Sequence, residues 1–373
     1  MIRPYCRIIL ISVICSILFF FFCERNKNSI SPDENNLAFV IYFLQDENLK
    51  IKDAVDMSSD SIRLQNKPWL TNKDIEMYDW SSHCIYLKKD KSAFIPGYGT
   101  DEAKDAGFIQ DWYYKPFAVT AHNQLWYLGY FYPIIFTDKW LLPEINFKSI
   151  SYYPLDIINI DYPWLYREDI RYKESIKNAL IESGIFRGGI SAELDTLDGI
   201  NFIEIGDTST IEYNIIITNN DQDNLLILDP DLAGSEIFHY YNTGIVLLDQ
   251  QNNIYWSAYY SLLKSGDSIR RSIRLKGYTY IPDGEYYLQF QYAGHVQIQK
   301  AERKLSEGRY WIGPVRSDVY TCVKTSGMQK STVYKCKNAL IYNNFLDICN
   351  EYEDFYEQSL FFPEANRRII YGF

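Results

Sequence analysis

Apolar residues in the first half of the chain form short runs that predict buried strands. Leu37 to Leu44 is a continuous apolar run, long enough for one strand buried on both faces. Phe117–Thr120 and Leu125–Tyr130 indicate two further strands, and Ala121–Gln124 between them predicts a hairpin turn. His83 to Lys88 alternates with period two, which predicts another strand.

Helical patterns in the same half are few. Leu49 to Val55 predicts a short helix, and Thr71 followed by Asp74 is typical of a helix start, with a capping hydroxyl and an acid in the first turn. A clearer helix follows Asp169, a plausible cap, and stops at Gly184. Its apolar stripe consists of Tyr172, Ile176, Ala179 and Leu180. Strands with isolated helices predict an α+β module over residues 37–187.

From Gly188 onward, short strands follow one another with turn residues between them, which is typical of a β-sandwich. The predicted strands are Ile190–Leu194, Phe202–Ile205, Ile211–Thr218, Leu225–Leu228, Gly244–Leu248, Ile254–Ala258, Ser268–Leu275, Glu285–Tyr292 and Arg309–Cys322. Gly284 followed by Tyr286 and Leu288 resembles the tyrosine corner of immunoglobulin-like sandwiches. We therefore expect an all-β immunoglobulin-like sandwich over residues 188–325.

The last stretch, residues 326–373, is predicted to be a C-terminal extension that contains a helix. Its apolar positions recur at helical spacing, and Asn343 or Asn344 is a suitable cap. These positions are Phe345, Ile348, Cys349, Tyr352, Phe355 and Tyr356. The expected fold is thus an α+β N-terminal module followed by an immunoglobulin-like sandwich, with a C-terminal helix.

The N-terminus carries the pattern of an export signal. Arg3 and Arg7 precede an almost unbroken apolar run from Ile8 to Phe22, which is short for a membrane-spanning helix. Residues 1–22 are thus the predicted signal or anchor segment, and Cys23 follows at once as the first residue of a linker over residues 23–36. This order resembles a bacterial lipoprotein signal, which implies lipidation of Cys23. Phe20–Phe22 depart from the small residues expected before that cysteine, so an uncleaved anchor or a cut elsewhere stays open.

The amino-acid composition of the chain limits the classes of molecule that it could bind. The chain has 373 residues, 47% of them hydrophobic, which allows about two domains of roughly 100–200 residues each. Its formal net charge of -11 argues against nucleic acid, because phosphate binding requires a basic surface. The 33 Tyr are explained by strand propensity, since a tyrosine ring can cover a core while its hydroxyl stays in water.

Four cysteines follow Cys23: Cys84, Cys322, Cys336 and Cys349. An even number in an oxidising compartment permits disulfides. Cys322 and Cys336 flank a turn-rich stretch and could be hairpin partners, so they are the candidate disulfide. The alternative is that both are small buried hydrophobic residues.

Two regions of the chain resemble known families. The first resemblance is carried by four segments: Asp74-Ile-Glu-Met-Tyr-Asp-Trp-Ser-Ser-His-Cys-Ile-Tyr-Leu87, Lys115-Pro-Phe-Ala-Val119, Trp126-Tyr-Leu-Gly-Tyr130 and Tyr162-Pro163. These segments resemble a family of small, uncharacterised bacterial envelope lipoproteins, over roughly 37–186. Ile217-Thr-Asn-Asn220, Leu228-Asp-Pro-Asp231, Phe238-His-Tyr240 and Gly308-Arg-Tyr-Trp-Ile-Gly313 are similar to an immunoglobulin-like module appended to bacterial envelope proteins. The resemblances imply a location and a fold, and they supply no functional residues.

The search for catalytic chemistry selects no residue. His83 and Cys84 are adjacent on a predicted strand, so their side chains should point to opposite faces and form no dyad. His122, His239 and His295 have no second ligand at zinc spacing, and Asp221/Asp223 and Asp229/Asp231 fit loops better than calcium sites. No nucleophile elbow, phosphate loop or dinucleotide fingerprint is present. No catalytic, cofactor or metal residue is therefore predicted.

Tryptophans are concentrated in the first module. Core positions explain most of them, and one or two at a surface could instead stack on sugar rings. They are Trp69, Trp80, Trp112, Trp126, Trp140 and Trp164.

The leading hypothesis from the sequence is a non-enzymatic lipoprotein of the cell envelope, facing the periplasm or the exterior, with an interaction or structural role. Its expected partners are the lipid bilayer, through the N-terminus, and an envelope protein or glycan. The alternatives are an envelope hydrolase with paired carboxylates in a cleft, or a glycan-binding protein, both using the N-terminal module.

Overall fold

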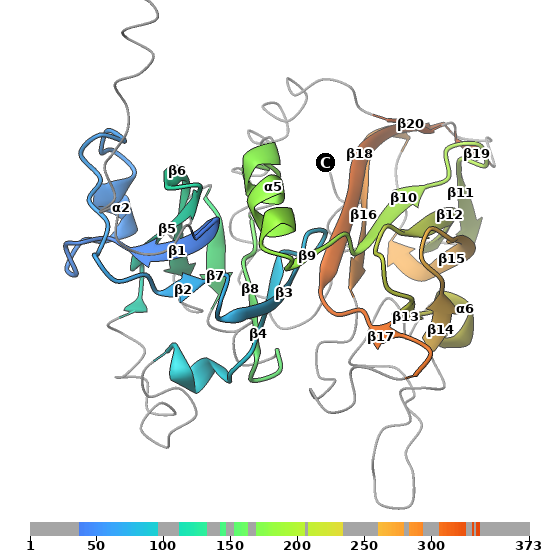
Figure 1. Ribbon diagram of the computed structural model, residues 1–373. Coiled ribbons are helices and arrows are strands. Elements are labelled where there is room, and N and C mark those ends of the chain that lie inside the picture. Colours follow the sequence, from blue (N-terminus) through green and yellow to red (C-terminus); the bar gives the residue numbers. More distant parts are fainter. Residues whose placement is uncertain are drawn as a thin grey trace, which may run out of the picture.

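The computed structural model describes residues 37–95, 112–132, 142–146, 153–162, 169–205, 208–233, 260–279, 283–293, 306–325, 330–331 and 333–335. These residues form a mostly β structure with several antiparallel and mixed sheets and a few short helices. Elements from residues 37–187 lie on one side of Figure 1, and those from residues 188–335 lie on the other. We refer to these as the N-terminal and C-terminal parts.

The first sheet of the N-terminal part has the strand order β2-β1-β5-β6-β7. Its strands are β1 (Phe39–Phe43), β2 (Leu70–Thr71), β5 (Pro116–Ala121), β6 (Gln124–Tyr132) and β7 (Glu144–Asn146). Every residue of β1 is buried, as the continuous apolar run predicts. The predicted β5–β6 hairpin is confirmed, and His122 and Asn123 at its turn both have positive φ.

The second sheet of this part has the order β8-β4-β3-β9. Its strands are β3 (Ile75–Asp79), β4 (Cys84–Leu87), β8 (Ile157–Asn159) and β9 (Phe186–Arg187). The helix predicted to start at Thr71 is wrong. Asp74 Oδ2 accepts hydrogen bonds from the backbone NH and the hydroxyl of Thr71, and this closes a tight turn that leads into β3. The strand predicted from His83 begins one residue later, because His83 has a φ of 51°.

Helices cover little of the part of the chain that the structure describes. They are α2 (Ile51–Ala54), the 3₁₀ turn η1 (Lys91–Ala93), α5 (Glu174–Glu182) and α6 (Pro230–Ala233). Ile176, Ala179 and Leu180 of α5 are buried, as predicted, and Gly184 ends the helix with a φ of 70°. Tyr172, predicted for the same stripe, instead precedes the helix and is exposed. Asp169 does not cap α5, which is a correction, because its carboxylate binds Arg171 instead.

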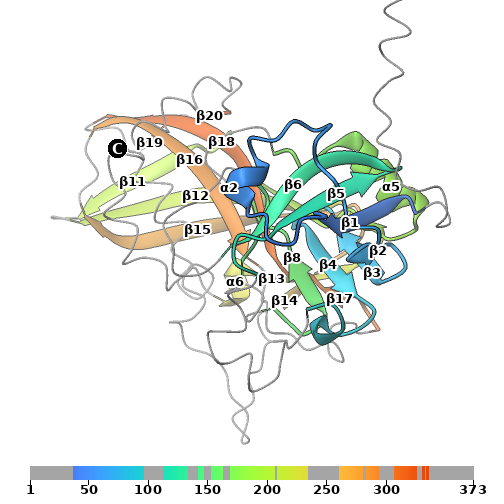
Figure 2. The same ribbon diagram turned by 90° about the vertical axis from the view of Figure 1, so that its left-hand side faces the viewer.

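An aromatic cluster fills the space between these two sheets. Phe43, Trp69, Trp112, Phe117 and Phe131 pack there with ring centroids 4.8–6.5 Å apart. The buried face of α5 closes the same core, which also contains Ile85 and Leu87 of β4. Figure 2 shows α5 beside β1 and β5 at the edge of the N-terminal part.

The C-terminal part contains mostly antiparallel strands, as predicted. Its elements are β10 (Ile190–Leu194), β11 (Ile200–Ile205), β12 (Thr208–Asn219), β13 (Leu225–Leu228), β14 (Tyr260–Leu263), β15 (Ser268–Thr279), β16 (Gly284–Ala293), β17 (Arg309–Tyr310), β18 (Pro314–Lys324), β19 (Lys330–Ser331) and β20 (Val333–Lys335). β12 pairs with β10 and β11 along one edge and with β15 along the other. β16, β18 and β20 form a separate sheet on which β10 packs.

The strand predicted over Arg309–Cys322 is two strands. β17 pairs with β13 in parallel, and β18 pairs with β16 in the antiparallel direction. Gly313, with a φ of 114°, lies in the break between them, and this conformation favours glycine. The chain therefore passes from one sheet to another at this point. The described residues do not include the predicted strands Gly244–Leu248 and Ile254–Ala258 or the predicted C-terminal helix.

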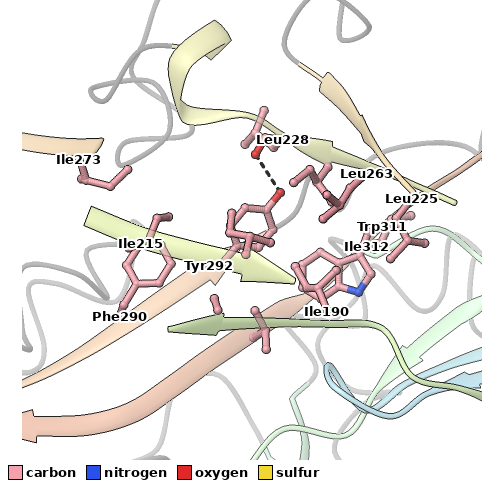
Figure 3. Close-up of a cluster of buried hydrophobic side chains, with 14 of the residues drawn as sticks. Ile190, Ile215, Leu225, Leu228, Leu263, Ile273, Phe290, Tyr292, Trp311 and Ile312 are labelled. Carbon is pink, nitrogen blue, oxygen red and sulfur yellow. Dashed lines mark hydrogen bonds between the residues drawn. The ribbon is translucent and has the colours of Figure 1, made fainter. Parts of the chain in front are cut away.

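One hydrophobic core joins the two parts. Figure 3 shows its centre, where Tyr292 donates a hydrogen bond to the carbonyl of Leu228, at 2.9 Å, among Ile215, Phe290 and Trp311. Four residues of the N-terminal part belong to the same cluster: Cys84, Tyr86, Tyr153 and Ile157. β4 is therefore buried on both faces, with Ile85 and Leu87 in one core and Cys84 and Tyr86 in the other.

Candidate functional site

A group of buried charged side chains lies between the two parts. It starts at the turn from β3 to β4, Asp79-Trp80-Ser81-Ser82-His83. Asp79 Oδ1 accepts hydrogen bonds from Ser81 N, at 3.2 Å, from Ser81 Oγ, at 3.0 Å, and from Ser82 N, at 3.4 Å. Such an Asx turn fixes the aspartate side chain close to its own backbone. The other oxygen of Asp79 is left to face the C-terminal part.

Arg309, the first residue of β17, meets this aspartate. Its Nη2 lies 3.5 Å from Asp79 Oδ2 and 2.5 Å from Asp221 Oδ2, and its Nε lies 3.8 Å from Asp223 Oδ2. Arg187 Nε lies 3.5 Å from the same oxygen of Asp223. We call these five residues the junction cluster. The side chains of Asp79 and Asp221 are fully buried and that of Arg309 is 5% exposed, so the opposite charges compensate one another away from water.

The loop that carries Asp221 is held by its own hydrogen bonds. Asn219 Oδ1 accepts from Asp221 N at 2.8 Å, and Asp221 Oδ1 accepts from Asp223 N at 3.0 Å. Asp221 Oδ2 also accepts from Gly189 N at 3.3 Å. The interpretation of Asp221/Asp223 as a loop is confirmed. The carboxylate of Asp221 faces a guanidinium group.

Burial controls the electrostatics of the junction cluster. Desolvation raises the pKa of Asp79; the positive charge of Arg309 opposes this rise and the negative charge of Asp221 adds to it. Burial alone would lower the pKa of Arg309, but the carboxylates around it, Asp79 first, raise it overall. Arg309 is therefore always charged, whereas Asp79 holds a proton more readily than an exposed aspartate does.

The spacing of these carboxylates invites comparison with a hydrolase. Because Asp79 Oδ2 and Asp221 Oδ2 lie 3.5 and 2.5 Å from one nitrogen, they are at most about 6 Å apart, an upper limit close to the shorter separations, roughly 5–5.5 Å, found in glycosidase pairs. A glycosidase pair flanks a substrate bond in an open cleft. Here a guanidinium fills the space between the two groups, and both are buried. This pair is consequently an ion-pair network and offers no position for a sugar.

His83 lies at the end of the same turn, and its ring is enclosed by aromatic side chains. Its Nδ1 is 2.9 Å from the hydroxyl of Tyr78, and its ring centroid is 4.6 Å from that of Tyr172 and 5.6 Å from that of Trp80. Burial, together with the positive charge of Arg171, lowers the pKa of His83 well below its usual value. The imidazole is therefore neutral at neutral pH.

Cys84 is separated from His83 in its surroundings, as predicted. Its thiol packs in the core shared by the two parts, and Asn159 Nδ2 donates to its sulfur at 3.4 Å. Burial raises the pKa of Cys84 to about 12, so the thiolate that nucleophilic catalysis needs is scarce. The adjacent pair does not form a catalytic dyad.

The remaining sequence candidates are dispersed. His122 lies at an exposed turn, 3.6 Å from Glu182, and Asp229 binds Arg271 in an ion pair. His239 and His295 lie outside the described residues, as do Cys23, Cys336 and Cys349. Cys322 is buried on β18 with its backbone opposite Val333, so the predicted Cys322–Cys336 disulfide stays a prediction. Among the residues described, no group of three or more His, Cys, Asp or Glu is placed to hold a metal ion.

The tryptophans of the first module are core residues where they are described. Trp112 is buried, and Trp69, Trp80 and Trp126 are partly buried and pack against the same core. Tyr172, 45% exposed, is the single aromatic residue among the large hydrophobic side chains found exposed in the described ranges. A flat aromatic platform for sugar stacking is not formed by these residues. Trp140 and Trp164 lie outside them.

The junction cluster was missed in the sequence, although two signals pointed to it. Arg309 stands in the apolar stretch Arg309-Tyr-Trp-Ile-Gly313, and an arginine in such a stretch needs a partner when it is buried. Asp79 precedes Ser81 and Ser82, which is a common arrangement for an Asx turn. Neither signal identifies the partner, because Asp79 and Arg309 are far apart in the chain.

No described helix is both long and apolar enough to cross a membrane. Comparisons of the chain with protein-family models, with curated proteins and with solved structures found no match.

Proposed function

We propose that this chain is an exported lipoprotein, tethered to the cell envelope through Cys23, that serves an interaction or structural role instead of catalysis. The observation that carries the proposal is the order of features at the N-terminus: Arg3 and Arg7, the apolar run Ile8–Phe22, Cys23 and then a polar linker. A diacylated cysteine of this kind would hold the folded parts at a membrane surface, facing the periplasm or the exterior.

The side chains described in the two parts support a non-catalytic role. The buried carboxylates of the junction cluster are neutralised by Arg309, the thiol of Cys84 stays protonated, and His83 is enclosed by rings. Each of these groups is used to hold the structure together. The hydrolase and glycan-binding alternatives gain no specific observation from the described residues.

The assignment of residue ranges to modules is part of the same proposal. We assign residues 37–187 to an α+β module and residues 188–325 to an immunoglobulin-like sandwich, followed by an extension with a helix. The antiparallel strands β10–β12, β15, β16 and β18 support the sandwich, as does the packing of β10 on the β16–β18 sheet. Loops and sheet edges of such a module are suited to binding an envelope protein or glycan, although a fold alone does not fix a function.

Fractionation of expressing cells tests the tether. The wild-type chain should sediment with membranes and incorporate radiolabelled palmitate, and Cys23→Ala should lose both properties. Cys15→Ala, within the apolar run, is the matched control and should behave as the wild type. A soluble cytoplasmic wild-type chain would contradict export, and unchanged label in Cys23→Ala would contradict lipidation at this residue.

Capture experiments test the interaction role. The tethered chain, used as bait in intact envelopes, should retain a defined envelope protein or glycan after crosslinking. Release of reducing sugars or of peptides from purified cell wall by the chain would instead support the hydrolase alternative.

A further inference from the structure

We propose that the junction cluster locks the N-terminal and C-terminal parts into a single rigid body that unfolds as one unit. Two domains joined by a flexible linker would have few contacts between them. In this chain a fixed orientation would follow from the contacts of Arg309 with Asp79 and Asp221. The inference does not depend on the membrane tether.

The polypeptide connection between the two parts is itself held in place. Ile190 N donates a hydrogen bond to Ser81 Oγ at 3.1 Å, and Gly189 N donates to Asp221 Oδ2. Gly189 has a φ of 69°, and a Cβ there would lie 2.1 Å from Ser81 Oγ and 2.3 Å from Asp79 Oδ1. The connection therefore fits closely against the Asp79 turn, and a glycine is required for this approach.

Arg309 is the residue on which the lock depends. Asp79 belongs to the N-terminal part and Asp221 to the C-terminal part, and one guanidinium nitrogen contacts both. A small shift between the parts that leaves Asp79 buried would remove the positive charge that compensates it. An unpaired buried charge is far more costly than an unpaired exposed one, so small displacements at the junction are disfavoured.

A second set of contacts lies on the next segment of the chain. Arg316 of β18 contacts Asp161 Oδ1 at 3.3 Å and the carbonyl of Tyr162 at 3.1 Å, both in the N-terminal part. A Cβ on Gly313 would lie 2.7 Å from Ser82 Cβ and 2.9 Å from Cys84 Sγ. The segment from Arg309 to Arg316 is thus fixed against the β3–β4 turn at several points.

Apolar and charged contacts have different effects at this junction. The shared core around Cys84 and Tyr86 holds the parts together, but the gain from apolar burial is non-directional. The ion pairs and hydrogen bonds require one geometry, because each donor must meet its acceptor. Together they predict both adhesion and a single relative orientation.

Hydrogen exchange of the full-length chain during thermal unfolding tests the lock. Peptides from β5, in the N-terminal part, and β12, in the C-terminal part, should lose protection at the same temperature in the wild type. Arg309→Met should lower that temperature by roughly 5–15 °C and separate the two transitions. Arg274→Met is the matched control, since Arg274 pairs with Glu212 on the exposed surface of the C-terminal part, and it should shift both transitions together by no more than about 4 °C.

A pair of glycine variants keeps the test decisive if Arg309→Met does not fold. Gly189→Ala inserts a methyl group against Asp79 and Ser81, whereas Gly266→Ala changes a turn glycine of similar φ, 80°, that has open space around it. Gly189→Ala should lower the temperature more and separate the transitions, and Gly266→Ala should not separate them. Separate transitions in the wild type, or equal behaviour of the two alanine variants, would overturn the proposal.

Discussion

The aromatic cluster of the N-terminal part and the buried centre of the junction cluster, Asp79, Asp221 and Arg309, are held by opposite kinds of force. In the first, Phe43, Trp69 and Phe131 contact one another through rings that accept several angles, from 33° to 67°. In the second, one guanidinium lies against two buried carboxylates from different parts of the chain, with a hydrogen bond to Asp221 and an ion pair alone to Asp79. Apolar packing tolerates a change of shape, whereas buried charge tolerates no loss of its partner. The two clusters should therefore respond differently to substitutions of similar volume.

The largest difference is expected for Arg309→Met. The methionine keeps much of the volume but leaves Asp79 and Asp221 buried side by side without a compensating cation, so the free energy of unfolding should fall by about 3–5 kcal/mol. Urea unfolding followed by circular dichroism measures this fall. A change below about 1 kcal/mol would show that water reaches the cluster and that burial of these charges is incomplete.

An intermediate effect is expected for His83, at the end of the β3–β4 turn that begins with Asp79. Its pKa is lowered in the folded chain, so the unfolded chain binds the extra proton first as the pH falls below about 6.5. Stability should then decrease on acidification by up to about 1.4 kcal/mol per pH unit until the folded value is reached.

His83→Asn removes this contribution and suits the positive φ of the position. The difference in unfolding free energy between wild type and His83→Asn should thus depend on pH below about 6.5 and be constant above it. Denaturant unfolding at a series of pH values measures it. A difference that does not vary with pH would mean that the imidazole is protonated to the same extent in both states.

A smaller effect is expected in the aromatic cluster. Phe131→Leu keeps an apolar side chain among Phe43, Trp69 and Trp112, so the unfolding free energy should fall by about 1 kcal/mol. The same urea experiment measures it. A loss as large as that of Arg309→Met would remove the contrast between the two clusters.

The smallest effect is expected for an exposed ion pair. Arg274 Nε lies 2.9 Å from Glu212 Oε1, and the arginine side chain is 51% exposed. Arg274→Ala should change the unfolding free energy by less than about 1 kcal/mol, because water and salt screen the pair. At 0.5 M salt the Debye screening length is on the order of a few ångströms, so the difference in unfolding free energy should be smaller still. A larger cost would show that this pair acts as a buried one.

Several strands of this protein could be predicted from local patterns. Ile190–Leu194 and Leu225–Leu228 match β10 and β13, because apolar content and turn residues are local properties of the sequence. The helix expected at Thr71 failed because Thr71 and Asp74 form the same side-chain hydrogen bonds at a turn as at a helix start. The next residues, Ile75–Asp79, then pair with β4 and decide in favour of a strand.

The junction cluster could not be predicted in this way. The contact between Asp79 and Arg309 depends on how two distant segments are brought together, and a single sequence contains no direct sign of that pairing. The separation of the His83 and Cys84 side chains was predicted, but its structural cause differs from the predicted one. His83 precedes the strand in a positive-φ turn, whereas the prediction placed it on the opposite face of the strand.

Strand β4 has a consequence for how the chain acquires its structure. Synthesis proceeds from the N-terminus, so the core that contains Ile85 and Leu87 can form early. The core that contains Cys84 and Tyr86 also includes Tyr292 and Trp311, which are synthesised much later. Tyr153 and Ile157 belong to the same core and emerge earlier, but until Tyr292 and Trp311 emerge this core is incomplete and part of its apolar surface is open to water and to other chains. A nascent protein of this design depends on being shielded or on being finished quickly, because such late-covered faces are where misassembly begins.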